Sequence, residues 1–264
     1  MSAKYFNDVG CGFIPGRRIV NIFGNAENVL SSDTPCTLWP LKTLYEFPTV
    51  GESWQVRSTS PHDTVGGIGA ENVLIDILDP LYIQQPPLLI NLAGTTPVLL
   101  PTGVNNFRVN AMNIVDSGAR HTNVGDIILE SSTSSAVRAL ILAEKGAAVA
   151  FSYTVPAGHN LWVPNFLFNM AKLGGGGGVA WKSEFRVMLP NQTILVASTA
   201  SIIAGSSEIT VPAGFSIGEK LTIEERIFTV SANGCDINVQ CTGILTDLTD
   251  PSVVQRLPTA WTEY

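Results

Sequence analysis

Three histidines and four cysteines are the residues of this 264-residue chain that could bind a metal ion. His62, His121 and His159 lie far apart in the sequence, beside turn residues, and none has a partner in an HxH or HxxxH pattern. The cysteines form no CxxC pair, which zinc sites commonly use. The spacing favours surface or turn histidines over ligands, and we expect neither a metal nor a cofactor.

Acidic residues could supply the two carboxyl groups of a glycosidase. The candidates are Asp76, Asp79, Asp126, Glu130, Glu219, Glu224 and Glu225. Nothing in their spacing selects two of them, and solvated strand faces or turns explain them more simply. The glycine run Gly174–Gly178 lacks the following Lys-Ser/Thr of a phosphate-binding loop, so a flexible hairpin tip is the simpler interpretation. We therefore expect no catalytic residue and no enzyme activity.

The composition favours a protein that is covered by other subunits. Hydrophobic residues make up 45% of the chain and charged residues 14%, against about 25% charge in ordinary soluble proteins. A large core in a monomer is the alternative explanation, but weakly charged, apolar faces are typical of permanent contacts. The net charge is −7 and Arg17-Arg18 is the longest basic run, which disfavours nucleic-acid binding.

Membrane insertion and secretion are also disfavoured. The most apolar stretch, residues 139–155, is interrupted by charges and is too short to span a bilayer. The N-terminus lacks the continuous apolar region of a signal peptide. Cys11, Cys36, Cys235 and Cys241 are expected to be free thiols, and Cys235 and Cys241 share the apolar face of one strand. Reduced cysteines suit a protein that folds in a cytoplasm.

Strand patterns dominate the chain, and helix patterns are nearly absent. The expected strands are 54–58, 73–78, 88–92, 107–115, 126–129, 137–143, 148–155, 161–169, 181–189, 208–211, 220–230 and 235–245. Short strands separated by Gly and Pro turns indicate a sandwich or barrel. We expect an all-β fold, a β-sandwich of jelly-roll type. Asn233-Gly234, between the last two strands, predicts a tight hairpin.

The ends of the chain differ from its middle. Residues 1–50 combine many prolines and glycines with scattered aromatics, so we expect an extended N-terminal arm. Residues 51–247 are expected to form the sandwich, with a possible sub-module from about residue 193, and residues 248–264 a C-terminal tail. Because apolar side chains on an arm need a partner surface, we predict an assembly interface there. Its residues are Tyr5, Phe6, Phe13, Ile14 and Phe23.

An ordered series of short motifs resembles a known family. The motifs are Phe23-Gly24-Asn25-Ala26-Glu27, Tyr45-Glu46-Phe47-Pro48-Thr49, Arg57-Ser58-Thr59-Ser60 with Asp63-Thr64, Gly66-Gly67-Ile68-Gly69-Ala70, Asn91-Leu92-Ala93-Gly94-Thr95, Phe107-Arg108-Val109-Asn110, Asn123-Val124-Gly125-Asp126-Ile127, Tyr153-Thr154-Val155-Pro156-Ala157-Gly158 and Phe215-Ser216-Ile217-Gly218-Glu219-Lys220. In order and spacing they resemble virion structural proteins of tailed bacteriophages, podoviruses included. The resemblance covers about residues 23–247.

The resemblance implies a structural role in a phage particle and no catalytic residue. We expect a capsid decoration or cement protein that stabilises the head through subunit contacts. Its partners would be other copies of itself, as a trimer, and the major capsid protein. Two alternatives stay open. One is a tail or head-fibre component, and the other is a carbohydrate- or receptor-binding module of the particle.

Overall fold

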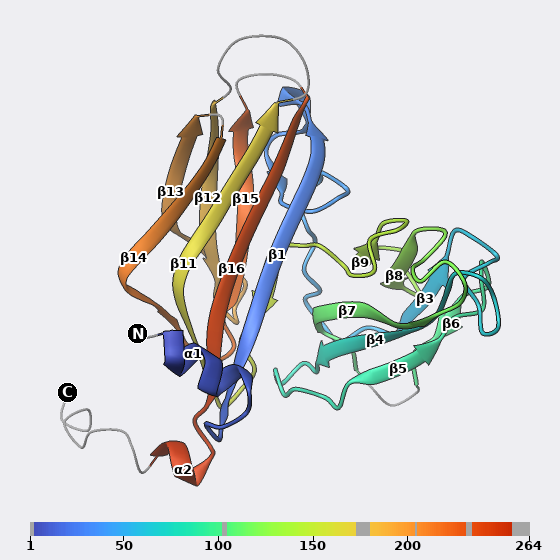
Figure 1. Ribbon diagram of the computed structural model, residues 1–264, viewed down its shortest axis with the longest axis horizontal. Coiled ribbons are helices and arrows are strands. Elements are labelled where there is room, and N and C mark those ends of the chain that lie inside the picture. Colours follow the sequence, from blue (N-terminus) through green and yellow to red (C-terminus); the bar gives the residue numbers. More distant parts are fainter. Residues whose placement is uncertain (1–2, 102–104, 173–179, 204, 231–233, 255–264) are drawn as a thin grey trace.

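The computed structural model describes residues 3–101, 105–172, 180–203, 205–230 and 234–254. Strands make up 53% of the described residues and helices 6%, which confirms the all-β prediction. The strands form two bodies with separate hydrophobic cores, a tall sandwich and a smaller domain beside it (Figure 1).

The tall sandwich contains eight main strands. They are β1 (Arg17–Val29), β10 (Ser152–Thr154), β11 (His159–Lys172), β12 (Ala180–Met188), β13 (Ile194–Ile203), β14 (Gly205–Ile217), β15 (Thr222–Val230) and β16 (Cys235–Asp247). Four antiparallel pairs are nested in the sequence: β1 with β16, β10 with β15, β11 with β14, and β12 with β13. The pairs form one sheet in the order β1-β16-β11-β14 and a second in the order β10-β15-β12-β13. A ribbon of strand pairs rolled into two sheets in this way is an eight-stranded jelly roll, and the predicted fold class is confirmed.

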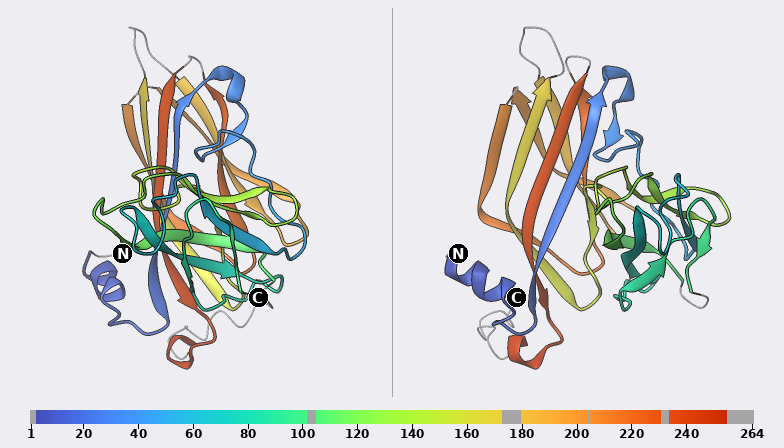
Figure 2. Two further views of the ribbon diagram at one scale, coloured as in Figure 1. Left: turned by 90° about the vertical axis from the view of Figure 1, so that its right-hand side faces the viewer. Right: turned by 45° about the vertical axis from the view of Figure 1, so that its right-hand side comes forward.

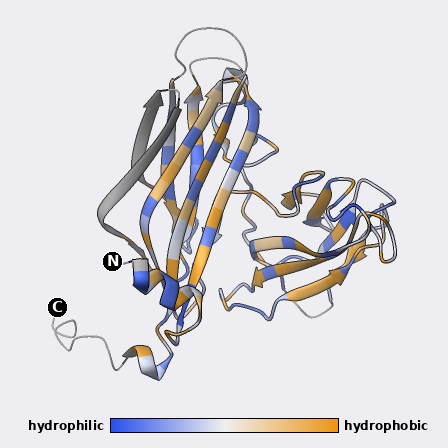
Figure 3. Ribbon diagram, viewed as in Figure 1, coloured by the Kyte–Doolittle hydropathy of each residue, from blue (hydrophilic) through white to orange (hydrophobic). Residues whose placement is uncertain are grey.

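Alternation of side chains builds the core of the jelly roll. Hydrophobic and hydrophilic residues alternate along β11, β12, β15 and β16 (Figure 3), so that one face of each sheet can be buried. In β16 the alternating residues Cys235, Ile237, Val239 and Cys241 are buried, as the sequence predicts, and the strand then continues with three consecutive buried residues, Gly243, Ile244 and Leu245. Aromatic rings from both sheets meet between them, with the ring centroids of Phe166 and Phe185 4.9 Å apart.

The smaller domain is an insertion between β1 and β10. Its strands are β3 (Trp54–Ser58), β4 (Ala70–Leu78), β5 (Leu88–Asn91), β6 (Val98–Leu99), β7 (Arg108–Ser117), β8 (Ile127–Ser131) and β9 (Val137–Ile141). They form a sheet in the order β6-β3-β8-β9 and another in the order β5-β4-β7. Trp54, Ile75, Met112 and Leu129 contribute to its own buried core. Two turned views show this domain against one side of the jelly roll (Figure 2).

Short elements complete the fold. They are α1 (Ala3–Gly10), a 3-10 turn η1 (Ser31–Asp33), β2 (Cys36–Thr37), which pairs with β15, and α2 (Pro251–Val254). Helix α1 packs on the outer face of the first sheet. Val9 is buried there, and the ring centroids of Phe6 and Trp162 are 6.2 Å apart. Glycine at position 24 lets β1 approach the second sheet, since a Cβ there would lie 2.5 Å from Cβ of Phe151.

The structure divides the chain differently from the predicted arm, sandwich and tail. Much of residues 1–50 belongs to the jelly roll: β1 pairs along its length with β16, and Ile22, Ala26 and Leu38 lie in the core. Strands β13 to β16 complete the same sandwich, so residues from 193 onward form no separate sub-module. The prolines and glycines of the N-terminal segment interrupt the alternation of hydrophobic and polar residues, but residues 17–29 between them form a long edge strand. Of the predicted tail, residues 255–264 lie outside the described part of the chain.

The hairpin predicted at Asn233-Gly234 is wrong. Strand β15 pairs with β2, β10 and β12, whereas β16 pairs with β1 and β11, so the connection crosses from one sheet to the other. A turn signal describes local backbone geometry, and it does not report which sheet each flanking strand joins. The predicted hairpin tip at Gly174–Gly178 lies outside the described residues; the strands that flank it, β11 and β12, also belong to different sheets.

Candidate functional site at the domain junction

Hydrogen bonds tie the inserted domain to the jelly roll. The side-chain amide of Asn110 in β7 donates to the Thr154 carbonyl at 2.8 Å and accepts from the Thr154 amide at 2.9 Å. The Ala157 amide donates to the carbonyl of Tyr82 in the inserted domain at 2.8 Å. These contacts hold the two domains at their shared boundary.

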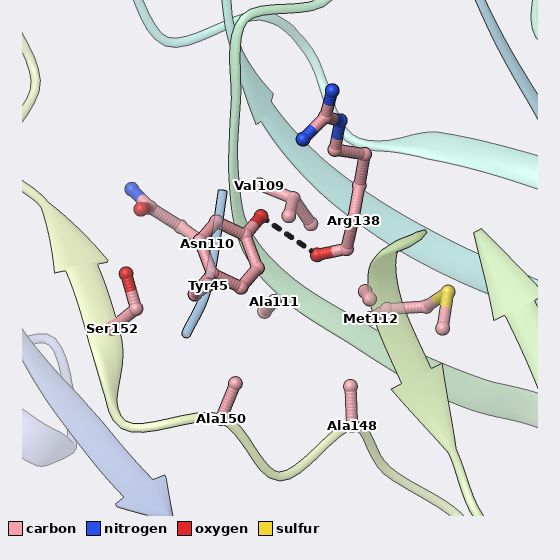
Figure 4. A pocket seen from close by; sticks show the side chains of 10 residues that line it. Tyr45, Val109, Asn110, Ala111, Met112, Arg138, Ala148, Ala150 and Ser152 are labelled. Atoms are coloured by element: carbon pink, nitrogen blue, oxygen red, sulfur yellow. Dashed lines mark hydrogen bonds between the residues drawn. The ribbon is translucent and has the colours of Figure 1, made fainter. Parts of the chain in front are cut away.

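A small pocket lies at the same boundary (Figure 4). Tyr45 projects into it, and its hydroxyl donates to the Arg138 carbonyl at 2.8 Å. Arg138 itself binds both carboxylate oxygens of Glu52, at 2.9 and 2.8 Å. Burial raises the pKa of Tyr45 to about 12, so the phenol stays protonated. The pocket has a volume of about 40 Å³, room for roughly one water molecule, and cannot hold a substrate.

A second buried arginine supports the linker between the domains. Arg108 donates to the Pro48 carbonyl at 2.6 Å, and its guanidinium lies 3.9 Å from the ring centre of Phe107. Burial lowers the pKa of Arg108 from its ordinary value, and the surrounding rings compensate part of the lost hydration. Arg108 therefore has a structural role.

Four of the nine motifs that carry the phage resemblance gather around Asp63 in the inserted domain. This fully buried carboxylate accepts hydrogen bonds from the Ser58 hydroxyl at 2.6 Å and from the backbone amides of Ala70, Val124 and Gly125 at 2.8–2.9 Å. The Gly94 amide donates to the Asp63 carbonyl. The two adjacent motifs at residues 57–70 and the two more distant ones at residues 91–95 and 123–127 thus meet at one residue that joins loops, and their shared role is architectural.

Most of the carboxylates considered as catalytic candidates have structural partners. Glu130 binds Arg57, Glu224 binds Thr37 and Arg186, Asp79 and Asp126 accept backbone amides of nearby turns or strands, and Glu219 accepts the Gly158 amide. Asp76 lies in a cleft between the domains. Glu225 points into the jelly-roll core. The structure brings no two of these seven together across an open cleft, within the part of the chain that it describes.

Glu225 is fully buried, and neither carboxyl oxygen has a hydrogen bond of normal geometry. Burial raises its pKa to about 8, an effect that Ser183 opposes and that Glu224 and Glu184 reinforce. At neutral pH the group is therefore mostly protonated, which allows it to lie among apolar side chains.

The remaining nucleophiles and metal ligands are scattered. The spacing of Gly214, Ser216 and Gly218 matches the nucleophile pattern of serine hydrolases, but Ser216 lies within strand β14 and its hydroxyl bonds Asn160, not a histidine.

In the described ranges no three His, Cys, Asp or Glu side chains gather as metal ligands would. No helix in those ranges is long and apolar enough to cross a membrane. All four cysteines are free; Cys11 is exposed and the other three are buried.

The five predicted assembly residues have different environments. Tyr5 accepts a hydrogen bond from Arg17, and Phe6 packs against Trp162, so both contact the protein's own body. Ile14 is half-buried. Phe13 remains 75% exposed and Phe23 39% exposed. Phe13 and Phe23 are the two that remain available to a partner.

Sequence reasoning missed a second exposed apolar segment, at the free edge of the jelly roll. Strand β13 is the last strand of its sheet, on the side away from the inserted domain (Figures 1 and 2). Ile194, Leu195 and Val196 are 44%, 51% and 52% exposed. Residues 194–203 contain no charge and no proline, two features that commonly block pairing of edge strands. A backbone bulge between Val196 and Ser198 leaves uninterrupted segments on either side.

Comparisons with known proteins add little. No family model and no curated protein matches the chain. The solved structure of the infectious bursal disease virus Gx strain is 10% identical, covers 89% of this chain and 73% of its own, and has a TM-score of 0.25. The VP2 subviral particle of that virus has 9% identity, coverages of 90% and 75%, and a TM-score of 0.23. PBSX exported protein XepA has 8% identity, covers 86% of this chain and 86% of its own, and has a TM-score of 0.19. At TM-scores this low the likenesses carry no argument, so the jelly roll is assigned from strand order alone.

Proposed function

We propose that this chain is a structural subunit of a virus particle. The observation that carries the proposal is the strand order β1-β16-β11-β14 facing β10-β15-β12-β13. This eight-stranded jelly roll is one of the architectures that viral coat proteins use, and lectin domains and cupins share it. The packed aromatic rings between the two sheets leave no room there for a substrate, which favours a structural role over an enzyme.

The finer proposal is a decoration or cement protein on the head of a tailed bacteriophage. It is supported by the family resemblance of the sequence and by the low charge of the chain. Its partners would be the major capsid protein and other copies of itself, in a trimer. A tail or head-fibre component is the second candidate, since the same fold and surface would serve there.

Copy number in purified particles tests the location. Quantitative gel or mass spectrometry should give this chain a copy number comparable to that of the major capsid protein. A copy number far below it would indicate a tail or head-fibre part. Absence of the chain from particles that infect normally would refute the virion role.

Self-association is tested at strand β13. Replacing Leu195 with Lys places a charge on the free edge, and edge charges oppose strand pairing. Light scattering should show a trimeric mass for the wild-type chain and a smaller mass for Leu195→Lys. The control is Leu167→Lys, on the central strand β11, which should keep the wild-type mass. If both variants remain trimeric, β13 is not the subunit contact.

A further inference from the structure

A cleft runs between β1 of the jelly roll and strands β4 and β7 of the inserted domain. Its volume is about 160 Å³, and its walls include Arg18, Asn21, Asp76, Asn110, Ala111 and Tyr153. A second hollow of about 280 Å³ shares Arg18 and continues past His159 and Asp247. The cleft is larger than the junction pocket beside Tyr45, and clefts between domains are frequent sites of ligand binding.

Tyr153 carries a buried polar group that faces this cleft without a satisfactory partner. The residue is only 4% exposed, and its hydroxyl makes no hydrogen bond of normal geometry with the described residues. Burial raises the pKa of Tyr153 to about 12, and the charge of Arg18 together with its hydrogen-bonding contact to the hydroxyl opposes that shift, so Arg18 is the group that the hydroxyl approaches at the cleft wall. A buried hydroxyl without a well-aligned partner is unfavourable, so a group that enters from the cleft and bonds it would be stabilised there.

Asp76 provides an acceptor on the opposite wall. It is partly buried, and within the described residues it accepts no hydrogen bond and forms no close ion pair. Burial raises its pKa, and Arg18 opposes that shift from across the cleft. The cleft therefore combines a guanidinium that only donates, a carboxylate that only accepts and a phenol that does both.

We propose that this cleft binds one unit of a neutral saccharide. A sugar hydroxyl both donates and accepts, so neighbouring hydroxyls of one ring can satisfy Arg18, Asp76 and Tyr153 together. A free anion would be repelled by Asp76 and a free cation by Arg18, which favours an uncharged ligand. Val20 and Ala111 offer apolar contacts for the C–H groups of the ring. The volume corresponds to roughly five water molecules, the scale of a single sugar ring.

The inference deepens the proposed function, because on a virus particle such a site would contact glycans of the host surface. Binding itself does not depend on where in the particle the chain is located. The location is measured by copy number and the site by ligand binding to the purified full-length chain, so either proposal can fail without the other.

The test uses glucose, galactose, mannose and N-acetylglucosamine as probes. Their binding is measured by saturation-transfer NMR and titration calorimetry. At least one should bind wild-type protein, and Tyr153→Phe and Asp76→Asn should each weaken that binding at least tenfold. The matched control is Tyr45→Phe. Tyr45 is also a buried phenol with a pKa raised to about 12, but its hydroxyl is already bonded to Arg138.

Stability separates a binding role from a structural one. Tyr45→Phe should lower the melting temperature and retain binding, because it removes an internal hydrogen bond. Tyr153→Phe should leave the melting temperature unchanged or higher and lose binding. Three outcomes overturn the proposal: no probe binds the wild-type chain, binding survives both Tyr153→Phe and Asp76→Asn, or inorganic phosphate displaces the sugar from the same site.

Discussion

Asn110 and Thr154 form a reciprocal pair of hydrogen bonds across the domain boundary, at 2.8 and 2.9 Å. Thr154 is buried, so a change at Asn110 leaves its backbone amide and carbonyl without partners. Asn110→Ala should lower the free energy of unfolding by about 1–3 kcal/mol, as measured by urea denaturation. The exposed Asn113 lies on the same strand, and Asn113→Ala should have little effect. Equal losses in the two variants would contradict this role for Asn110.

Asp63 should be among the least replaceable residues of the inserted domain. An Asn side chain presents one acceptor oxygen, so Asp63→Asn loses part of a set of four hydrogen bonds. We expect a loss of at least about 3 kcal/mol, since each hydrogen bond to a charged group contributes about 1.5–3 kcal/mol. Urea denaturation measures it, with the exposed neighbour His62→Ala as control. A loss below that of the control would show that the loops hold together without this carboxylate.

Glu225 should make stability fall as the pH rises. Its pKa is raised from 4.5 in the unfolded chain to about 8 in the fold, so between these values the folded state holds a proton that the unfolded state has lost. The free energy of unfolding should be highest below about pH 4.5, decline up to about pH 8 and then level off. The total decline is on the order of 5 kcal/mol. Glu225→Gln cannot ionise and should flatten this slope.

The control for Glu225 is the exposed Glu27, and Glu27→Gln should keep the wild-type slope. Thermal melts from pH 4 to 9 provide the measurement. A Glu225→Gln profile that runs parallel to wild type would show that other groups cause the pH dependence.

The four cysteines should separate into two reactivity classes. Cys11 is exposed on the N-terminal segment and should react with a disulfide reagent at once. Cys36 and Cys241 are buried, and burial raises their pKa to about 11 and about 12, which suppresses the reactive thiolate. Together with buried Cys235 they should react only after unfolding. Rapid modification of more than one thiol in the native protein would contradict the structure.

Deletion of residues 1–20 should destabilise the jelly roll. It removes α1, which covers the outer face beside Trp162, and the part of β1 that pairs with residues 243–246. Thermal melting should show a clear decrease in the melting temperature of the truncated chain. A truncated chain as stable as wild type would restore the interpretation of residues 1–20 as a separable arm.

Side-chain periodicity was enough to locate most strands. Trp54–Ser58 was predicted with the bounds that the structure gives to β3, because large and polar residues alternate there without interruption. The alternation in the first half of β16 likewise predicted that Cys235, Ile237, Val239 and Cys241 are buried. Strand β1 was missed, since Gly24, Asn25 and Asn28 are weak strand formers and its pairing with β16 compensates for them.

The sequence by itself determined the fold class, the burial pattern of the strands and the free state of the cysteines, because these follow from local alternation and composition. The tertiary structure decided the strand order, the insertion of a second domain and the direction taken after Asn233-Gly234. It also brought Arg18, Asp76 and Tyr153 to one cleft and four separated motifs to Asp63. Such contacts join residues far apart in the chain, and their energy depends on how whole sheets pack, which no local pattern encodes.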